Sequence, residues 1–189
     1  ALTNLLIELQ LKRGLSVILG DVGTGKTTLS RKLIRILKDK EDFTVCCLFD
    51  PCFQDEYEFF DSLIRNFEIK LGNGFLGWRP LVQRRSLLQM KEALAEFLYK
   101  RCVLDGKKVV LIVDEAQKLN DSLLESLRMI LNYETNDRKL IQMVLFGQLE
   151  FYSKISKFTN FLDRVSFKYT LNPLSLQETQ QMINFRLLQ

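Results

Sequence analysis

The sequence contains no histidine, and this absence excludes several kinds of chemistry. Without an imidazole there is no histidine general base and no serine–histidine triad, and most catalytic zinc sites are excluded as well. Long apolar runs are also lacking. The longest are short segments such as residues 109–113 (VVLIV), far below the roughly 18 residues that a membrane-spanning helix needs. No signal peptide is visible, and because the chain opens with Ala1 rather than methionine we expect a piece of a longer protein.

The four cysteines lack the spacing of a metal or disulfide framework, because no C-x-x-C pair is present. Cys46 and Cys47 fall in an apolar run, where a reduced cysteine packs like a small hydrophobic residue. We therefore expect core packing rather than a redox role. Reduced cysteines also favour a reducing compartment, so we expect a cytoplasmic location.

Neither sign of charge dominates the chain. Lysine and arginine number 27 and aspartate and glutamate 23, giving a net charge of +4, and no five like charges occur together. The most basic stretch, residues 79–108, follows a helical pattern and is typical of a solvated face. The loop 72–80 carries Trp78 and Arg79, which either contact a partner, a membrane or DNA, or fold back onto the next helix. DNA binding is thus permitted by the charge but not demanded.

Short apolar runs alternate with helical periods along the 189 residues. Five of these runs are expected strands, at residues 15–19, 43–49, 109–113, 140–146 and 165–171. The expected helices span residues 1–12, 27–38, 55–71 and 81–102, with two more opening at the capping-box patterns Ser122-x-x-Glu125 and Ser175-x-x-Glu178. Strands that alternate with helices predict an α/β protein with a parallel sheet.

A phosphate-binding loop is predicted between the first strand and the second helix. Residues 20–27 read GDVGTGKT and match G-x-x-x-x-G-K-[ST] at every fixed position. Glycines let backbone N–H groups approach phosphates, the lysine reaches the β/γ-phosphates and the Thr27 hydroxyl ligates Mg²⁺. A chance glycine-rich turn is the alternative, which the strand–loop–helix context disfavours. The candidate nucleotide-binding residues are Gly20, Asp21, Val22, Gly23, Thr24, Gly25, Lys26, Thr27 and Thr28.

A second motif follows the apolar strand 109–113, where Asp114 and Glu115 stand at its carboxyl end. Ligands bind at that edge of a parallel sheet. Asp114 is a candidate Mg²⁺ ligand, and Glu115 a candidate general base for an attacking water. Alone, the pair is equally compatible with a turn after a buried strand. Together with Lys26, 88 residues earlier (114 − 26 = 88), it predicts a nucleotide-hydrolysing site with room for the strand 43–49 between the motifs.

Four further segments carry a family resemblance. Residues 114–119 read DEAQKL, 131–135 LNYET, 146–150 FGQLE and 171–175 LNPLS. In combination they resemble the AAA+ ATPases of the general secretion pathway protein A type, relatives of the TniB-type transposition accessory ATPases. The resemblance implies a P-loop NTPase three-layer sandwich with a five-stranded parallel sheet. It also implies ATP and Mg²⁺ as cofactors, a nucleotide-binding domain over residues 1–172 and the first helix of a truncated lid over residues 173–189.

The resemblance also implies roles for two residues. Gln148 matches the sensor 1 position at the end of the fourth strand, although a loop amide that caps a helix is the alternative. Arg164 matches an arginine finger that would reach the nucleotide of a neighbouring subunit, against the alternative of a surface arginine paired with Asp163. Candidate catalytic residues are therefore Lys26, Glu115, Gln148 and Arg164.

The expected partners follow from the same resemblance. They are further copies of the chain, with composite ATP sites, and secretion or pilus assembly proteins at the bacterial inner membrane. The protein would be tethered to the cytoplasmic face of that membrane by a part outside this sequence. The alternative is a DNA-associated ATP switch of the transposition accessory type. A nucleotide-binding scaffold without hydrolysis is a weaker alternative, because Asp114 and Glu115 are both present.

Overall fold

The computed structural model describes residues 1–70, 86–135 and 138–187. The expected loop 72–80, with Trp78 and Arg79, lies outside these residues. So does the start of the helix predicted over 81–102. The remaining predicted elements can be compared with the structure directly.

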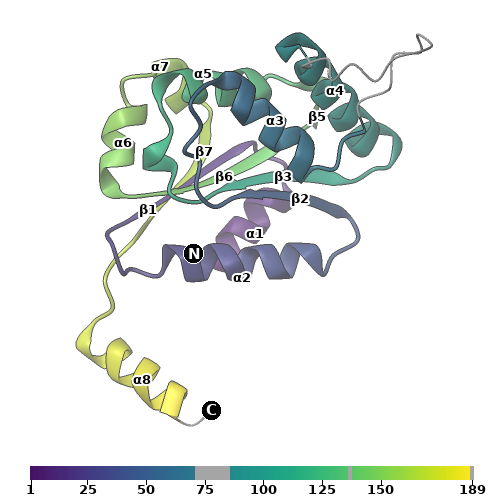
Figure 1. Ribbon diagram of the computed structural model, residues 1–189. Helices are drawn as coiled ribbons and strands as arrows, with labels where there is room; N and C mark the ends of the chain where they lie inside the picture. The colour runs from purple at the N-terminus through teal and green to yellow at the C-terminus, as the bar shows by residue number, and fades with distance from the viewer. Residues whose placement is uncertain (71–85, 136–137, 188–189) are drawn as a thin grey trace, which may run out of the picture.

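A parallel sheet of five strands forms the centre of the molecule and confirms the predicted α/β fold (Figure 1). Its strand order is β2-β3-β6-β1-β7, and all four neighbouring pairs are parallel. β6 therefore lies between the two strands that carry the sequence motifs. β2, which lies between those motifs along the chain, forms one edge of the sheet. The strands are β1 (Leu15–Gly20), β2 (Phe43–Leu48), β3 (Lys108–Val113), β6 (Gln142–Gly147) and β7 (Val165–Leu171).

Helices cover both faces of this sheet. Figure 1 shows α1 (Leu2–Gln10) and α2 (Lys26–Lys38) on one face, with the helices from α3 to α7 on the other. Successive side chains of a strand point to opposite faces, so β3 supplies Val110 and Ile112 to one core and Leu111 to the other. The opposite layer comprises α3 (Glu56–Asn66), α4 (Leu87–Tyr99), α5 (Asp121–Leu131), α6 (Leu149–Ile155) and α7 (Thr159–Leu162).

The first predicted capping box is wrong. The α5 helix begins at Asp121, so Ser122 lies inside its first turn, and Asn120 caps the helix by accepting a 2.9 Å hydrogen bond from the Leu123 N–H. Glu125 instead accepts a bond from Arg128 Nε at 2.8 Å.

The second predicted capping box is confirmed. At the start of α8 (Leu176–Leu187), the Ser175 N–H donates to Glu178 Oε2 at 2.8 Å, and the Glu178 N–H donates to Ser175 Oγ at 3.3 Å.

Three helices end before their predicted bounds. The predicted helix 1–12 ends at Gln10, and Lys12 already has a left-handed φ of 54°. The predicted helix 55–71 ends at Asn66, because Glu68 adopts a left-handed backbone with φ of 54° that a helix cannot include. The α4 helix continues as η1, a π-helical turn over Lys100–Leu104. The pattern also missed a short antiparallel pair, β4 (Glu134–Thr135) and β5 (Arg138–Lys139), which is too short to give a period.

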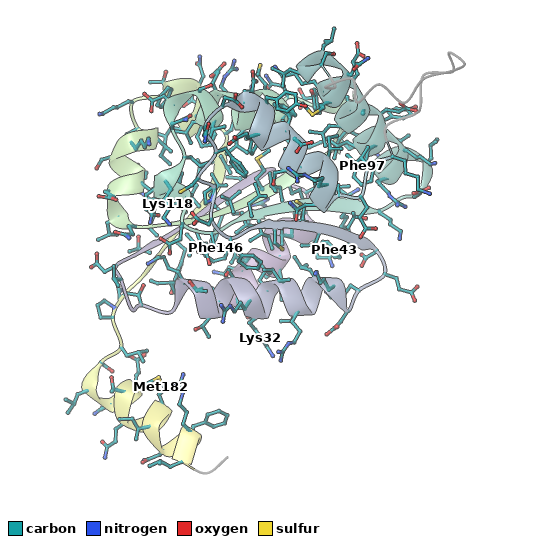
Figure 2. All side chains as sticks on the ribbon, viewed as in Figure 1. Lys32, Phe43, Phe97, Lys118, Phe146 and Met182 are labelled. Carbon is teal, nitrogen blue, oxygen red and sulfur yellow. The ribbon has the colours of Figure 1, made fainter. Side chains whose placement is uncertain are left out.

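The last helix stands apart from the sheet. Figures 1 and 2 show α8, which carries Met182, beyond the end of β7. None of the described α8 side chains is buried. Its assignment to a lid stays a prediction. Among the described residues, no helix is both long and apolar enough to cross a membrane.

Candidate nucleotide-binding site

The loop between β1 and α2 uses its glycines for two different physical reasons. Gly23 and Gly25 have φ values of +82° and +89°, which disfavour any residue with a Cβ, and the space beside them is open. Gly20 has no such backbone requirement. A Cβ there would lie 2.6 Å from Thr24 Oγ1 and 3.0 Å from the Leu171 carbonyl oxygen, so it is close packing that requires glycine at position 20.

Lys26 begins the helix α2 and is held against the loop. Its Nζ donates to the carbonyl oxygens of Gly20, at 2.8 Å, and Asp21, at 2.7 Å. The residue is 6% exposed. The Thr24 hydroxyl donates to the same Asp21 carbonyl at 2.8 Å and closes the turn. The ammonium group is thus fixed against the phosphate loop. The loop leads into α2, whose first N–H groups have no intrahelical partner and favour an anion.

Asp114 follows β3, contacts Ser30 of α2 and is 2% exposed. Ser30 Oγ lies 3.1 Å from Asp114 Oδ2 and 3.0 Å from the Thr27 carbonyl oxygen, so its one proton serves either acceptor. The other carboxylate oxygen of Asp114 accepts the Glu115 N–H at 3.1 Å. Both oxygens of the predicted Mg²⁺ ligand are therefore oriented from within the protein.

Glu115 marks a sharp change of direction after β3. Its φ and ψ of 55° and 40° lie in the left-handed region, which costs a residue other than glycine about 1–2 kcal/mol. The chain then enters the short 3₁₀ turn η2 (Ala116–Lys118). Gln117, on this turn, donates from Nε2 to Glu115 Oε2 at 2.6 Å and accepts the Gln148 N–H at Oε1, at 3.2 Å.

One hollow of about 400 Å³ joins the two predicted motifs. It lies at the carboxyl edge of the sheet, where β1, β3 and β6 end next to one another. Gln148 stands at the N-terminal cap position of α6, and its side chain makes no capping bond, so the alternative of a helix-capping amide is not what the structure has. The lining residues are Val22, Gly23, Gly25, Lys26, Thr27, Thr28, Glu115 and Gln148.

Five predicted site residues do not line this hollow: Gly20, Asp21, Thr24, Asp114 and Arg164. The first three belong to the phosphate loop itself, and Asp114 contacts α2 through Ser30. Within the part of the chain that the structure describes, Arg164 has no such connection to the site. It follows α7, and its Nε is buried without a hydrogen-bond partner among the described residues. Within that same part of the chain, no salt bridge joins Arg164 to Asp163. The alternative of a surface pair is therefore not observed.

Ser30 and Gln117 were missed by sequence reasoning. Ser30 lies one helical turn after Thr27, and this spacing was the available signal that it shares a helix face with the loop. Gln117 belongs to the DEAQ segment, but its spacing from Glu115 does not by itself predict a contact. The two side chains meet only because Glu115 adopts a left-handed backbone. Both contacts depend on backbone geometry that periodicity does not encode.

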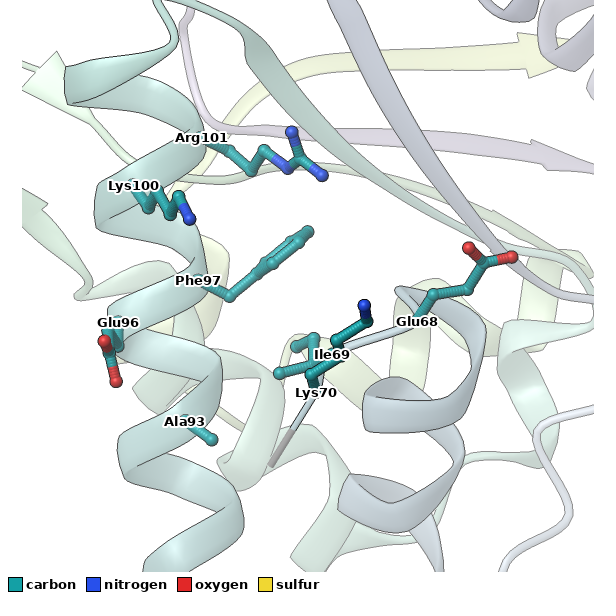
Figure 3. Close-up of a pocket in the computed structure, with 8 residues that line it drawn as sticks. All are labelled: Glu68, Ile69, Lys70, Ala93, Glu96, Phe97, Lys100 and Arg101. Atoms are coloured by element: carbon teal, nitrogen blue, oxygen red, sulfur yellow. The ribbon is translucent and has the colours of Figure 1, made fainter. Parts of the chain in front are cut away.

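A second hollow, of about 330 Å³, lies between the end of α3 and the helix α4 (Figure 3). The Arg101 guanidinium lies 5.5 Å from the ring centre of Phe97, and acidic and basic side chains are mixed along the walls. It shares none of its lining residues with the hollow at the phosphate loop. Among the described residues, no cluster of three cysteine or acidic side chains is arranged to hold a metal ion.

Cys46 and Cys47 pack in or against the core, as the sequence predicts. Cys46 is 1% exposed in the core, and burial raises its pKa far above the ordinary value for a thiol. Burial raises the pKa of Cys47 to about 11, although the positive charge of Lys38 acts in the opposite direction. Cys52 is exposed, and its hydrogen bond with Asp50 raises its pKa. All four thiols are free.

Comparison with known proteins supports the same reading of the chain. General secretion pathway protein A of Aeromonas hydrophila is 31% identical over 189 residues, which are 99% of this chain and 32% of that protein. The chain thus spans about a third of the length of this relative.

Two solved structures share the fold at lower identity. The ORC2 protein of Aeropyrum pernix, in ADPNP and ADP complexes, has a TM-score of 0.70 and 18% identity over 98% of this chain and 49% of its own. Cdc6p of Pyrobaculum aerophilum has a TM-score of 0.73 and 19% identity over 98% and 48%. The family model described as AAA domain matches residues 10–155. By its sequence and its fold, the chain belongs to the AAA domain family.

Proposed function

We propose that this chain is the ATP-hydrolysing core of a larger AAA+ machine and that it uses Mg²⁺. The observation that carries the proposal is the single hollow in which Lys26, Thr27, Glu115 and Gln148 converge from three adjacent strand ends. AAA family membership supports nucleotide hydrolysis in general. ATP rather than GTP rests on the family, because the phosphate loop recognises phosphate and not the base.

The residues at the edge of the sheet fit ATP and Mg²⁺ by the chemistry of their donors. Lys26 and the N–H groups that open α2 suit the phosphates. The Thr27 hydroxyl and the Asp114 carboxylate are the oxygen ligands that Mg²⁺ prefers. Held by Thr27 and Asp114, Mg²⁺ would neutralise the negative charge that develops during phosphoryl transfer.

The remaining side chains divide the reaction between them. Glu115 accepts a proton from the attacking water, as a carboxylate beside the phosphate site can. Gln148, at the end of β6, contacts the γ-phosphate or that water through its amide. Lys26 leaves the two loop carbonyls and binds the β- and γ-phosphates, exchanging neutral acceptors for charged ones.

Arg164 completes the site of a neighbouring copy in this proposal. Its buried, unpartnered Nε belongs to a guanidinium that has no ion pair within the described residues. In this proposal Arg164 supplies positive charge to the transition state at the ATP site of a neighbouring subunit. The active form is therefore a homo-oligomer with composite sites.

A mixing experiment tests the composite site. Glu115→Gln and Arg164→Ala subunits are each expected to be inactive, whereas a random mixture restores about a quarter of the interfaces and therefore turnover. A mixture that is as inactive as either variant would show that Arg164 does not act between subunits.

The machine itself is proposed from the relative. The relative is named for the general secretion pathway, so we place this chain in assembly or remodelling of a secretion or pilus apparatus, at the cytoplasmic face of the bacterial inner membrane. The alternative is a DNA-associated ATP switch. DNA binding whose affinity falls steeply with salt would favour the alternative, because phosphate contacts release counterions.

Phosphate release from ATP, with and without Mg²⁺, tests the enzymatic proposal. The parent is expected to turn over only with Mg²⁺. Lys26→Ala, which keeps the loop glycines, is expected to lose both ATP binding and turnover. Equal turnover by Lys26→Ala and the parent would refute the assignment of this hollow.

A further inference from the structure

We infer that Gln117 is a positioning residue that holds Glu115 for the attack of water and ties it to the end of β6. The inference rests on the proposed ATP hydrolysis and adds a residue to it. Two contacts of one amide support the inference. Gln117 Nε2 lies 2.6 Å from Glu115 Oε2, and Gln117 Oε1 accepts the Gln148 N–H at 3.2 Å.

The orientation of this amide is fixed by chemistry. An ionised carboxylate only accepts hydrogen bonds and a backbone N–H only donates them, so the NH₂ group must face Glu115 and the carbonyl oxygen must face Gln148. A carboxylate in the place of the amide could accept the Gln148 N–H but could not donate to Glu115. A glutamine is therefore required for both contacts, and no acidic side chain of the same shape replaces it.

The turn that carries Gln117 is itself anchored. Ala116 and Leu119, on either side of it, are fully buried in the core between the sheet and the helices α3–α7. Lys154 Nζ, on α6, donates to the Leu119 carbonyl oxygen and joins the turn to the helix that follows β6. Gln117 is therefore held by a well-packed turn, and from there its amide reaches Glu115, whose backbone is strained.

These contacts explain how the Glu115 side chain is held in one orientation toward the site, although its backbone is in the left-handed region. The backbone strain turns Glu115 toward the hollow, but its side chain still has free torsions that only a partner can fix. The bond from Gln117 selects one of these rotamers. The second hydrogen bond of Gln117, from the Gln148 N–H, fixes this rotamer relative to the carboxyl end of β6.

The test compares kcat and KM for ATP in the parent and in Gln117→Leu and Gln117→Glu. We expect kcat to fall about 10- to 100-fold in both variants with KM nearly unchanged, because a misplacement of about 1 Å costs roughly that much in rate without altering ground-state binding. Gln117→Glu keeps the size of the side chain, so it remains informative if Gln117→Leu does not fold. Gln89→Leu is the matched control, since its Oε1 also accepts a backbone N–H, from Ser86, but on α4.

A double-variant cycle separates positioning from a merely structural effect. In the Glu115→Gln background, Gln117→Leu is expected to lower kcat no further, because the residue acts through Glu115. A further fall there, an unchanged kcat in the single variants, or a rise in kcat would each overturn the inference. A parent without ATP turnover would instead refute the proposed function, so the two failures are distinguishable.

Discussion

Replacing Gly20 with alanine probes the packing beneath the phosphate loop. The new Cβ would lie 2.6 Å from Thr24 Oγ1, 3.0 Å from the Leu171 carbonyl oxygen and 3.2 Å from Leu171 Cβ. Thr24 cannot move away freely, because its hydroxyl donates to Asp21. Leu171 is the residue of β7 that pairs with Gly20, so relief at that side must displace the strand backbone.

The cost follows from these contacts. Overpacking of a close-packed site costs about 1–3 kcal/mol of unfolding free energy, which for a domain of this size lowers Tm by roughly 2–12 °C. The same displacement shifts the phosphate loop, which begins at Gly20 and carries the backbone N–H groups expected to bind phosphate. Loss of one charge-assisted bond to phosphate, about 1.5–3 kcal/mol, weakens MgATP binding about 10- to 100-fold.

Calorimetric titration of MgATP and thermal unfolding by circular dichroism give both quantities. Gly106→Ala is the control, because Gly106 has a φ of +67° with nothing within 4 Å of a Cβ and lies outside the hollow. That variant should lose about 1–2 kcal/mol by backbone strain alone and bind MgATP like the parent. If Gly20→Ala also bound MgATP like the parent, the close packing of Gly20 against β7 would not shape the site.

Three further predictions concern stability and reactivity. Ser30→Ala should lower the unfolding free energy by about 1–3 kcal/mol in thermal melts, since buried Asp114 loses a donor; an unchanged Tm would contradict the contact. Leu111→Ala, at a fully buried position of the interior strand β3, should cost about 2–5 kcal/mol and roughly 4–20 °C in Tm, and a shift no larger than that of Gly106→Ala would contradict its place in the core. Iodoacetamide should label only Cys52 in the native protein, faster at higher pH as its thiolate forms. Asp50→Asn should speed this labelling near neutral pH, because the Asp50 contact raises the pKa of Cys52; an equal or slower rate would contradict that contact.

The strands of the sheet were predictable because a strand that is buried on both faces has a continuous run of apolar residues. The continuous apolar run at 109–113 identifies a central parallel strand, and β3 lies inside the sheet as expected. The strand order was not predictable from periodicity. That β6 separates β1 from β3 depends on long-range packing, which single-strand patterns do not record.

Helix ends and the contacts within the site could not be predicted fully from the sequence. Ser122-x-x-Glu125 has the pattern of a capping box, but Asn120 begins the helix because it is itself a strong N-cap residue. Lys26 and Glu115 were found because their motifs are local in sequence. The Ser30–Asp114 contact joins residues 84 positions apart and exists only once the helix α2 packs against the sheet.

The most direct test of the account is the behaviour of Glu115→Gln. The amide keeps the size of the side chain and leaves Lys26 and the phosphate loop unchanged, so MgATP binding measured by calorimetry should match the parent. Turnover measured by phosphate release should fall about 100- to 10,000-fold, the range attributed to general-base catalysis. Hydrolysis by Glu115→Gln at the rate of the parent would contradict the central claim that this carboxylate activates the attacking water.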